Sequence, residues 1–172
     1  MRLVILALLL ASSAAQAQMS LRPGDGFEDC PSKAYPNLAL SLWDTALGTF
    51  PHSGVNQINV PFNGSLGLLF FAPQSPLSGQ FQGLPRGQNI GEMVIGLSSC
   101  PGAYPGLPAA CLSAIGTSPT LDWTTDVNGT GCQLIPGQGY YLNLSFGSAT
   151  APGQGEPWCA STCELSLQST PR

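Results

Sequence analysis

The sequence is poor in charge, and most of its charges are negative. Only 8% of the 172 residues are charged, with five Lys and Arg against nine Asp and Glu, so the formal net charge is −4. Nucleic-acid binding depends on clustered cations that neutralise phosphates, and attraction to anionic lipid needs the same clusters. The few scattered cations therefore argue against nucleic acid and against an anionic membrane surface as partners.

Long hydrophobic runs are also missing beyond the N-terminus. Residues 1–17 have the form of a secretory signal peptide, with Arg2, an apolar run over residues 3–10 and the small residues Ala15 and Ala17 before the cleavage site. The run is much shorter than the ~20 residues that a membrane-spanning helix needs. We predict a secreted or periplasmic protein with no membrane span, whose mature chain starts near Gln18. The alternative is an uncleaved anchor or a buried first helix.

Metal-binding patterns are scarce, whereas cysteines suited to disulfides are present. The chain has no C-x-x-C pair and only one histidine, His52, so zinc is disfavoured. An even number of cysteines in an oxidising compartment predicts three disulfides. We pair Cys100 with Cys111, which flank one Pro/Gly-rich loop, and leave open whether Cys159 and Cys163 pair with each other. The six disulfide residues are Cys30, Cys100, Cys111, Cys132, Cys159 and Cys163.

Helical periodicity is absent from most of the chain, which instead has 21 Gly, 16 Pro and short alternating apolar runs. This pattern predicts an all-β fold, a disulfide-stapled antiparallel β-sandwich that is jelly-roll-like and forms a single domain over residues 54–172. Residues 18–53 would be an acidic N-terminal arm, in which residues 37–50 fit a short helix or a strand. Asn63-Gly64 predicts a hairpin. The predicted strands lie near residues 58–62, 66–71, 93–97, 121–123, 140–146 and 165–167.

Several motifs occur in a specific order: Cys100-Pro-Gly, Cys111, Trp123, Cys132-x-Leu-x-Pro-Gly and Tyr140-Tyr-Leu-Asn143. In this order they resemble an uncharacterised family of small secreted proteobacterial proteins, described as hypothetical exported proteins, over roughly residues 55–168. The chain is also loosely similar to the β-sandwich domains appended to secreted bacterial proteases. Those domains likewise have an apolar strand near Phe-x-Ala-Pro (here residues 70–73) and a late Pro-Gly-x-x-Tyr-Tyr strand. This second resemblance implies a non-catalytic module, and neither resemblance supplies catalytic residues.

Catalytic motifs are few. A Ser-His-Asp triad would need His52 as its base, but this residue lies in a turn-like segment, and no Gly-x-Ser-x-Gly elbow is present. A glycosidase needs two carboxylates about 5–10 Å apart. The acids that could supply such a pair are Asp44, Glu92, Asp122, Asp126, Glu156 and Glu164. Catalysis is therefore the less favoured hypothesis.

Two kinds of binding residue are candidates. Asp122, Asp126 and Asn128 could supply oxygen ligands for calcium, although the spacing does not match an EF-hand and Asn128-Gly129 also fits an Asx turn between strands. Trp158, Tyr141 and Tyr104 could form an aromatic surface that stacks on sugars.

We predict a secreted, non-catalytic binding or surface-associated module whose partner is an extracellular glycan or a cell-surface protein, with no required cofactor. The alternatives are a small polysaccharide hydrolase that uses a carboxylate pair, or a structural envelope protein without a ligand. The sequence does not indicate the oligomeric state.

Overall fold

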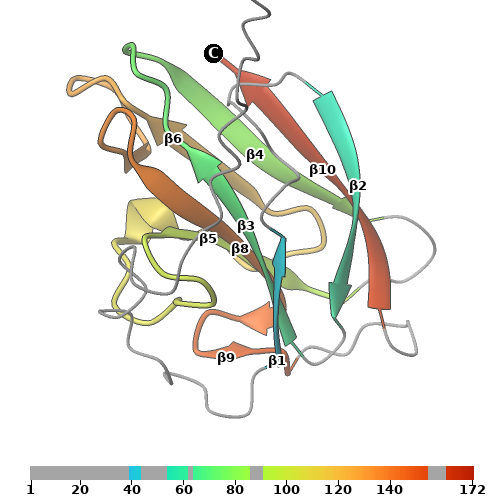
Figure 1. Cartoon of the computed structure of the whole chain (residues 1–172). Helices are drawn as coiled ribbons and strands as arrows, with labels where there is room; N and C mark the ends of the chain where they lie inside the picture. Colours follow the sequence, from blue (N-terminus) through green and yellow to red (C-terminus); the bar gives the residue numbers. More distant parts are fainter. Residues whose placement is uncertain (1–38, 44–53, 62–63, 86–90, 155–161) are drawn as a thin grey trace, which may run out of the picture.

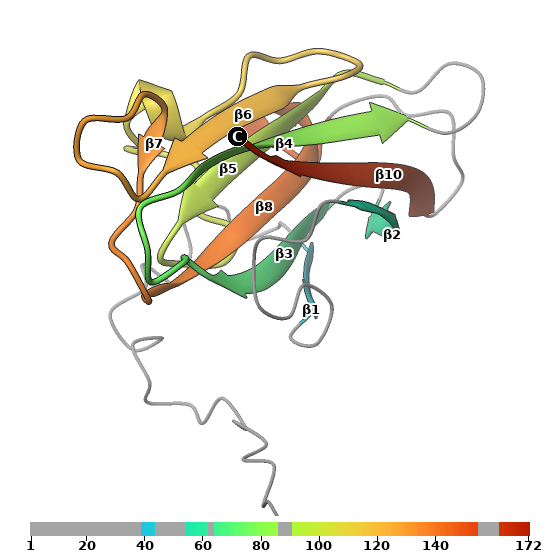
Figure 2. The same ribbon diagram turned by 90° about the horizontal axis from the view of Figure 1, so that it is seen from above.

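The computed structural model describes residues 39–43, 54–61, 64–85, 91–154 and 162–172, which form two β-sheets packed face to face (Figures 1 and 2). Sheet A has the strand order β1-β3-β8-β5, and β9 pairs with the end of β8. Sheet B has the order β2-β10-β4-β6-β7. The predicted all-β sandwich is confirmed, and most of its strand pairs are antiparallel.

The strand bounds follow the predicted apolar runs closely in most places. The strands are β1 Ala39–Trp43, β2 Gly54–Pro61, β3 Gly64–Phe71, β4 Ser78–Pro85, β5 Met93–Ser98, β6 Thr120–Thr124, β7 Cys132–Gln133, β8 Gly139–Ser148, β9 Ala151–Pro152 and β10 Thr162–Pro171. A short 3-10 helix, η1, covers Ala109–Cys111. No helix in the described ranges is long and apolar enough to cross a membrane.

Two connections differ from the expectation. The predicted hairpin at Asn63-Gly64 is wrong, because β2 belongs to sheet B and β3 to sheet A, so the chain changes sheet at this point. Residues 39–43, for which helix and strand were both open, form β1, which pairs in parallel with β3. The remainder of the 37–50 segment lies outside the described residues.

The core lies between the two sheets and is built by period-two alternation. In β8, Leu142, Leu144 and Phe146 point inward and are fully buried, and in β10 Leu165 and Leu167 do the same from the other sheet. Burying such side chains is the main favourable term for a sandwich. The alternation therefore leaves every second residue of each strand for an outer face.

The outer face of sheet A is covered by the chain itself, namely by residues 99–113, which we call the cover segment. Fully buried Tyr104 is hydrogen-bonded to Ser65 Oγ on β3 at 2.7 Å. Asn143 Oδ1, at the centre of β8, accepts a hydrogen bond from the Gly102 amide at 2.7 Å, and its amide nitrogen donates to Ser98 Oγ at 2.8 Å. The Cys-Pro-Gly and Tyr-Tyr-Leu-Asn motifs therefore meet here.

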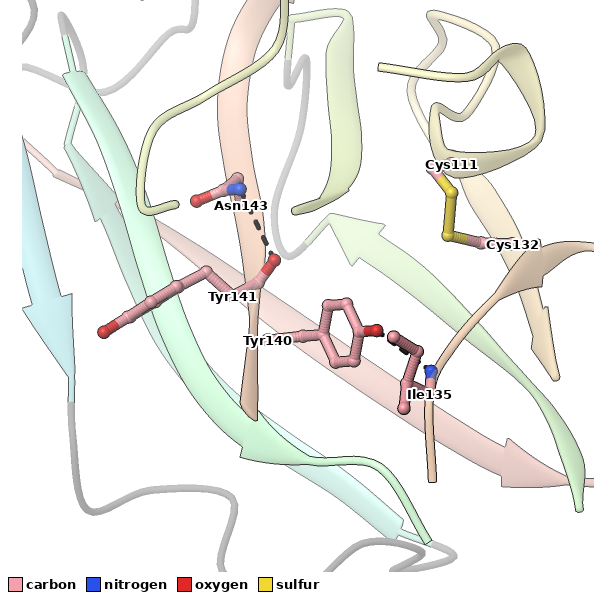
Figure 3. The surroundings of a disulfide bond; sticks show 6 residues. All are labelled: Cys111, Cys132, Ile135, Tyr140, Tyr141 and Asn143. Carbon is pink, nitrogen blue, oxygen red and sulfur yellow. Dashed lines mark hydrogen bonds between the residues drawn. A yellow bond between two sulfur atoms is a disulfide. The ribbon is translucent and has the colours of Figure 1, made fainter. Parts of the chain in front are cut away.

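The disulfide pairing differs from the prediction. Cys111, at the end of η1, is bonded to Cys132 in β7, with the two Cα atoms 4.5 Å apart (Figure 3). The predicted Cys100–Cys111 pair is wrong because the intervening residues spread over sheet A instead of closing on themselves. Cys100 and Cys163 are also disulfide-bonded. Cys30 and Cys159 lie outside the described residues.

Candidate binding surface

Three loops meet at one end of the sandwich, at the upper left of Figure 1. They comprise residues 71–77, which start at the last residue of β3, residues 125–131 after β6 and residues 134–138 before β8, and we call them together the loop end. The first and third are joined by two backbone hydrogen bonds, from the Ala72 amide to the Gln138 carbonyl at 2.9 Å and from the Gly137 amide to the Ala72 carbonyl at 3.0 Å.

The remaining contacts fix the second loop against the first. The Thr125 amide donates to the Leu77 carbonyl at 2.8 Å, and Thr125 Oγ1 donates to the Ser75 carbonyl at 2.9 Å. In the third loop the Ile135 amide donates to the Tyr140 hydroxyl at 2.9 Å (Figure 3). Because these loops are bonded to one another and to strand ends, the loop end is a preorganised surface.

Three large apolar side chains are exposed on the loop end. Val127 is 86% exposed, Ile135 63% and Phe71 39%. The fourth exposed large hydrophobic among the described residues, Ile115, precedes Gly116, which pairs with Met93. Met93 faces the far end of β8, so Ile115 lies about 20 Å from the loop end at ~3.3 Å per strand residue. Val127, Ile135 and Phe71 therefore all lie at the end of the sandwich opposite Ile115.

Local turn chemistry explains why these side chains face solvent. Asp126 Oδ1 accepts a hydrogen bond from the Asn128 amide at 3.0 Å, and the Gly129 amide donates to the Asp126 carbonyl at 2.9 Å. This Asx turn places Val127 at its tip. Ile135 follows buried Leu134 and precedes exposed Pro136. Asp126 is the one charged residue in the three loops, so the surface is nearly neutral.

Phe71, Val127 and Ile135 are not among the surface residues predicted from the sequence. Val127 and Ile135 each lie in a turn segment, next to Asn-Gly or Pro-Gly and away from the alternating runs. This pattern could have predicted that their side chains are exposed. Phe71 ends a strand whose residues are nearly all apolar, so its exposure could not be read from periodicity.

The residues predicted for calcium have partners of their own. Asp122 Oδ1 accepts a hydrogen bond from Gln80 Nε2 at 2.8 Å and lies 3.2 Å from a guanidinium nitrogen of Arg172. Asp126 and Asn128 form the Asx turn described above. In the part of the chain that is described, no group of three or more His, Cys, Asp or Glu residues is placed to hold a metal ion. Calcium binding stays a prediction.

The predicted aromatic surface is not assembled by the described residues. Tyr104 is fully buried and Tyr141 is 6% exposed, so neither presents a ring to a ligand in this structure. Tyr104 is buried because the cover segment brings it onto the outer face of sheet A. Burial also raises the pKa of the Tyr141 hydroxyl. Trp158 lies outside the described residues.

Asp122 and Glu164, two of the described acids, do not form a glycosidase pair. Asp122 and Glu164 both face outward from sheet B, but β4 lies between their strands, and Asp122 is in register with Gln80 while Glu164 is beside Pro85 and Leu84. Strand spacing and rise put their backbones about 20 Å apart, beyond the 5–10 Å of hydrolytic pairs. Asp44 and Glu156 lie outside the described residues.

No protein-family model and no curated protein matches the chain. A similar solved structure is the pre-peptidase C-terminal domain of a collagenase from Bacillus anthracis, 13% identical over 76% of this chain and 96% of that one, with a TM-score of 0.38. It is of the protease-appended kind that the sequence resembles. PliG from Aeromonas hydrophila, a periplasmic inhibitor of g-type lysozyme, is 12% identical over 78% and 100%, with a TM-score of 0.35. Both TM-scores are low, so neither protein indicates a ligand for this chain.

Proposed function

We propose that the protein is an exported, non-catalytic binding module that contacts another protein through the loop end. The observation that carries this proposal is that Val127, Ile135 and Phe71 are all exposed at the same end of the sandwich, on segments that hydrogen bonds hold in place. Exposed apolar clusters on a secreted domain commonly mark interaction sites.

Preorganisation supports the same proposal. Ordering flexible side chains and loops on binding costs free energy, so a surface that is already fixed keeps more of its contact energy. Large apolar side chains that enter a partner's pockets carry much of the binding energy of protein interfaces. The near absence of charge in the three loops favours an apolar and uncharged contact on the partner.

Disulfides support export. The four cysteines in the described ranges, Cys100, Cys111, Cys132 and Cys163, are all disulfide-bonded. Such bonds persist in oxidising compartments, which agrees with the predicted signal peptide.

The test compares the oxidised mature protein with a Val127→Ser/Ile135→Ser variant. Each protein is immobilised and exposed to an envelope and culture-supernatant extract of the host. A protein retained by the native chain alone is then purified and titrated by calorimetry. We expect its affinity for the variant to fall at least tenfold, because two apolar anchors are lost.

Ile115→Ser is the matched control, since it also removes an exposed isoleucine but at the far end of the sandwich. It should bind the purified partner as the native chain does. A role for the loop end would be refuted if the native chain and both variants bound every captured partner with equal affinity. It would also be refuted if the native chain captured no partner.

A further inference from the structure

The outer face of sheet B differs from that of sheet A because six of the eleven side chains named below are exposed. In the described part of the chain its side chains are mainly uncharged amides and hydroxyls, and we call it the amide face. Its members with described side chains are Gln57, Asn59, Gln80, Gln82, Leu84, Thr120, Asp122, Glu164, Ser166, Gln168 and Thr170. Gln57, Asn59 and Thr120 are exposed. In the middle of the face Gln82, Gln168 and Leu84 are half-buried, and Ser166 is buried at 6% exposure. Figure 2 shows β10, β4 and β6 side by side along this sheet.

Strand register arranges these side chains in rows. Gln82 of β4 lies opposite Gln168 of β10 on one side and Thr120 of β6 on the other. In an adjacent row Ser166 of β10 lies between Leu84 of β4 and Gln57 of β2. Strands are ~4.8 Å apart and outward residues ~6.6 Å apart along each strand, so the face covers about 15 by 20 Å.

Formal charge is confined to the margins of this face. Glu164 lies in the outermost described row beside Asn59. Asp122 lies at the opposite end and is paired with Arg172 at 3.2 Å. The rows of Gln82 and Ser166 between them carry no charge. Among the described residues of this face Arg172 is the one cation, and it is paired with Asp122. This pairing weakens the attraction of the described face for an anionic ligand and for a cationic one.

Amide and hydroxyl groups both donate and accept hydrogen bonds. A two-dimensional array of them matches a ligand that also presents many donors and acceptors without charge, which is the chemistry of a neutral polysaccharide. Exposed hydrogen bonds exchange with water and contribute little singly, so such a surface needs a ligand that makes many contacts at once. A polymer chain meets this requirement and a single sugar does not.

We propose that the amide face binds neutral polysaccharide chains, as a second surface that is independent of the loop end. The proposal does not rest on the protein partner, because the two surfaces share no residues. On the amide face, hydrogen bonds to the polysaccharide would provide recognition, and aromatic stacking would not be required.

The test is affinity electrophoresis of the oxidised mature protein in native gels that contain dextran, galactomannan or mixed-linkage β-glucan. We expect at least one of these neutral polymers to retard the protein, equally at low and high salt. The Gln82→Ala/Gln168→Ala variant should have a dissociation constant at least fivefold higher. Gln57→Ala changes an exposed position and should weaken retardation less than the double variant does. It serves as a second variant if the double variant is unstable.

Two controls separate this proposal from the previous one. Gln154→Ala removes an exposed amide near β9, away from sheet B, and Val127→Ser/Ile135→Ser removes the loop-end anchors. Both should be retarded as the native protein is. The proposal would be overturned if none of the three neutral polymers retarded the protein, or if the anionic polymer dextran sulfate, run as a further control, were the one polymer that did. It would also be overturned if the Gln82→Ala/Gln168→Ala variant had the same dissociation constant as the native protein. None of these results would affect the protein-partner test.

Discussion

Gly79 provides the space that the largest core side chain, Trp123, occupies. Trp123 of β6 is fully buried and faces Gly79 of β4, its register partner. A Cβ atom at Gly79 would lie 2.5 Å from Trp123 Cζ2, closer than atoms can pack. The indole and this glycine therefore form one packing unit, and glycine here provides space where other strand positions need a side chain.

We expect Gly79→Ala to destabilise the protein by about 1–3 kcal/mol, the usual cost of overpacking a core. Gly83→Ala is the matched control on the same strand and face, because its Cβ would meet Met93 and Pro119 only at 3.5 Å, an ordinary contact. That change should be neutral or slightly stabilising. Urea denaturation of the three proteins measures both effects, and equal stability of the two variants would contradict the packing argument.

Tyr141 gives stability a dependence on alkaline pH. Burial raises the pKa of its hydroxyl above the ordinary tyrosine value of 10.0, so the folded state holds the proton at pH values where the unfolded chain has lost it. The unfolded state then binds fewer protons, and stability falls as the pH rises above about 10. Below that pH the contribution is fully present.

The expected result is that the melting temperature of the native protein falls more steeply above pH 10 than that of Tyr141→Phe. The other tyrosines are common to both proteins, so the difference between the two curves belongs to Tyr141. Parallel curves from pH 8 to pH 11 would show that this hydroxyl titrates alike in the folded and unfolded states.

At the scale of elements, strands with strong alternation could be predicted and others could not. The runs that became β5 and β8 place Met, Ile, Leu or Phe at every second residue, which fixes both the strand and its inward face. β4 was missed because its inward positions are Gly79, Phe81 and Gly83, so only one large apolar side chain marks it. Its glycines serve partners from other strands, which the local sequence does not reveal.

The local sequence pattern also could not predict which sheet a strand joins or which side chains are exposed. Asn63-Gly64 has hairpin chemistry, yet β2 and β3 join different sheets, because strand pairing depends on β10, which comes a hundred residues later in the chain. Tyr141 of β8 and Tyr104 of the cover segment appeared suitable for a ligand. The burial of Tyr104 follows from long-range contacts of the cover segment, such as Tyr104 with Ser65 and Gly102 with Asn143.

The Cys111–Cys132 bond fastens the cover segment, through η1, to β7 at the edge of sheet B. Its sequence separation is 21 residues, and closing a loop of that length in the unfolded chain corresponds to about 3 kcal/mol of stabilisation. We therefore expect Cys111→Ala/Cys132→Ala to lose about that much stability under oxidising conditions, with the Cys100 and Cys163 disulfides left intact. Equilibrium unfolding in urea measures the loss.

Peptide mapping under non-reducing conditions is the accompanying control for this element. Digestion of the native protein should release a linked peptide pair that contains Cys111 and Cys132. Recovery of a peptide in which Cys111 is linked to Cys100 would support the pairing predicted from the sequence. In the urea experiment, a stability loss well under 1 kcal/mol would show that β7 holds the cover segment without the disulfide.

For the whole molecule, export and oxidation are one prediction, because the fold uses disulfides that only an oxidising compartment maintains. The protein purified from its host without reductant should start near Gln18 and should have an intact mass six hydrogens below that of the reduced chain, since all six cysteines are expected to be paired. Iodoacetamide without reductant should add no mass, because no cysteine in the described ranges is free. An intact mass that includes residues 1–17 would mean an uncleaved N-terminus, and alkylation of two cysteines would mean that one bond forms only after export. Either result would change the state of the chain in which both proposed surfaces must be tested, so this measurement comes before the binding experiments.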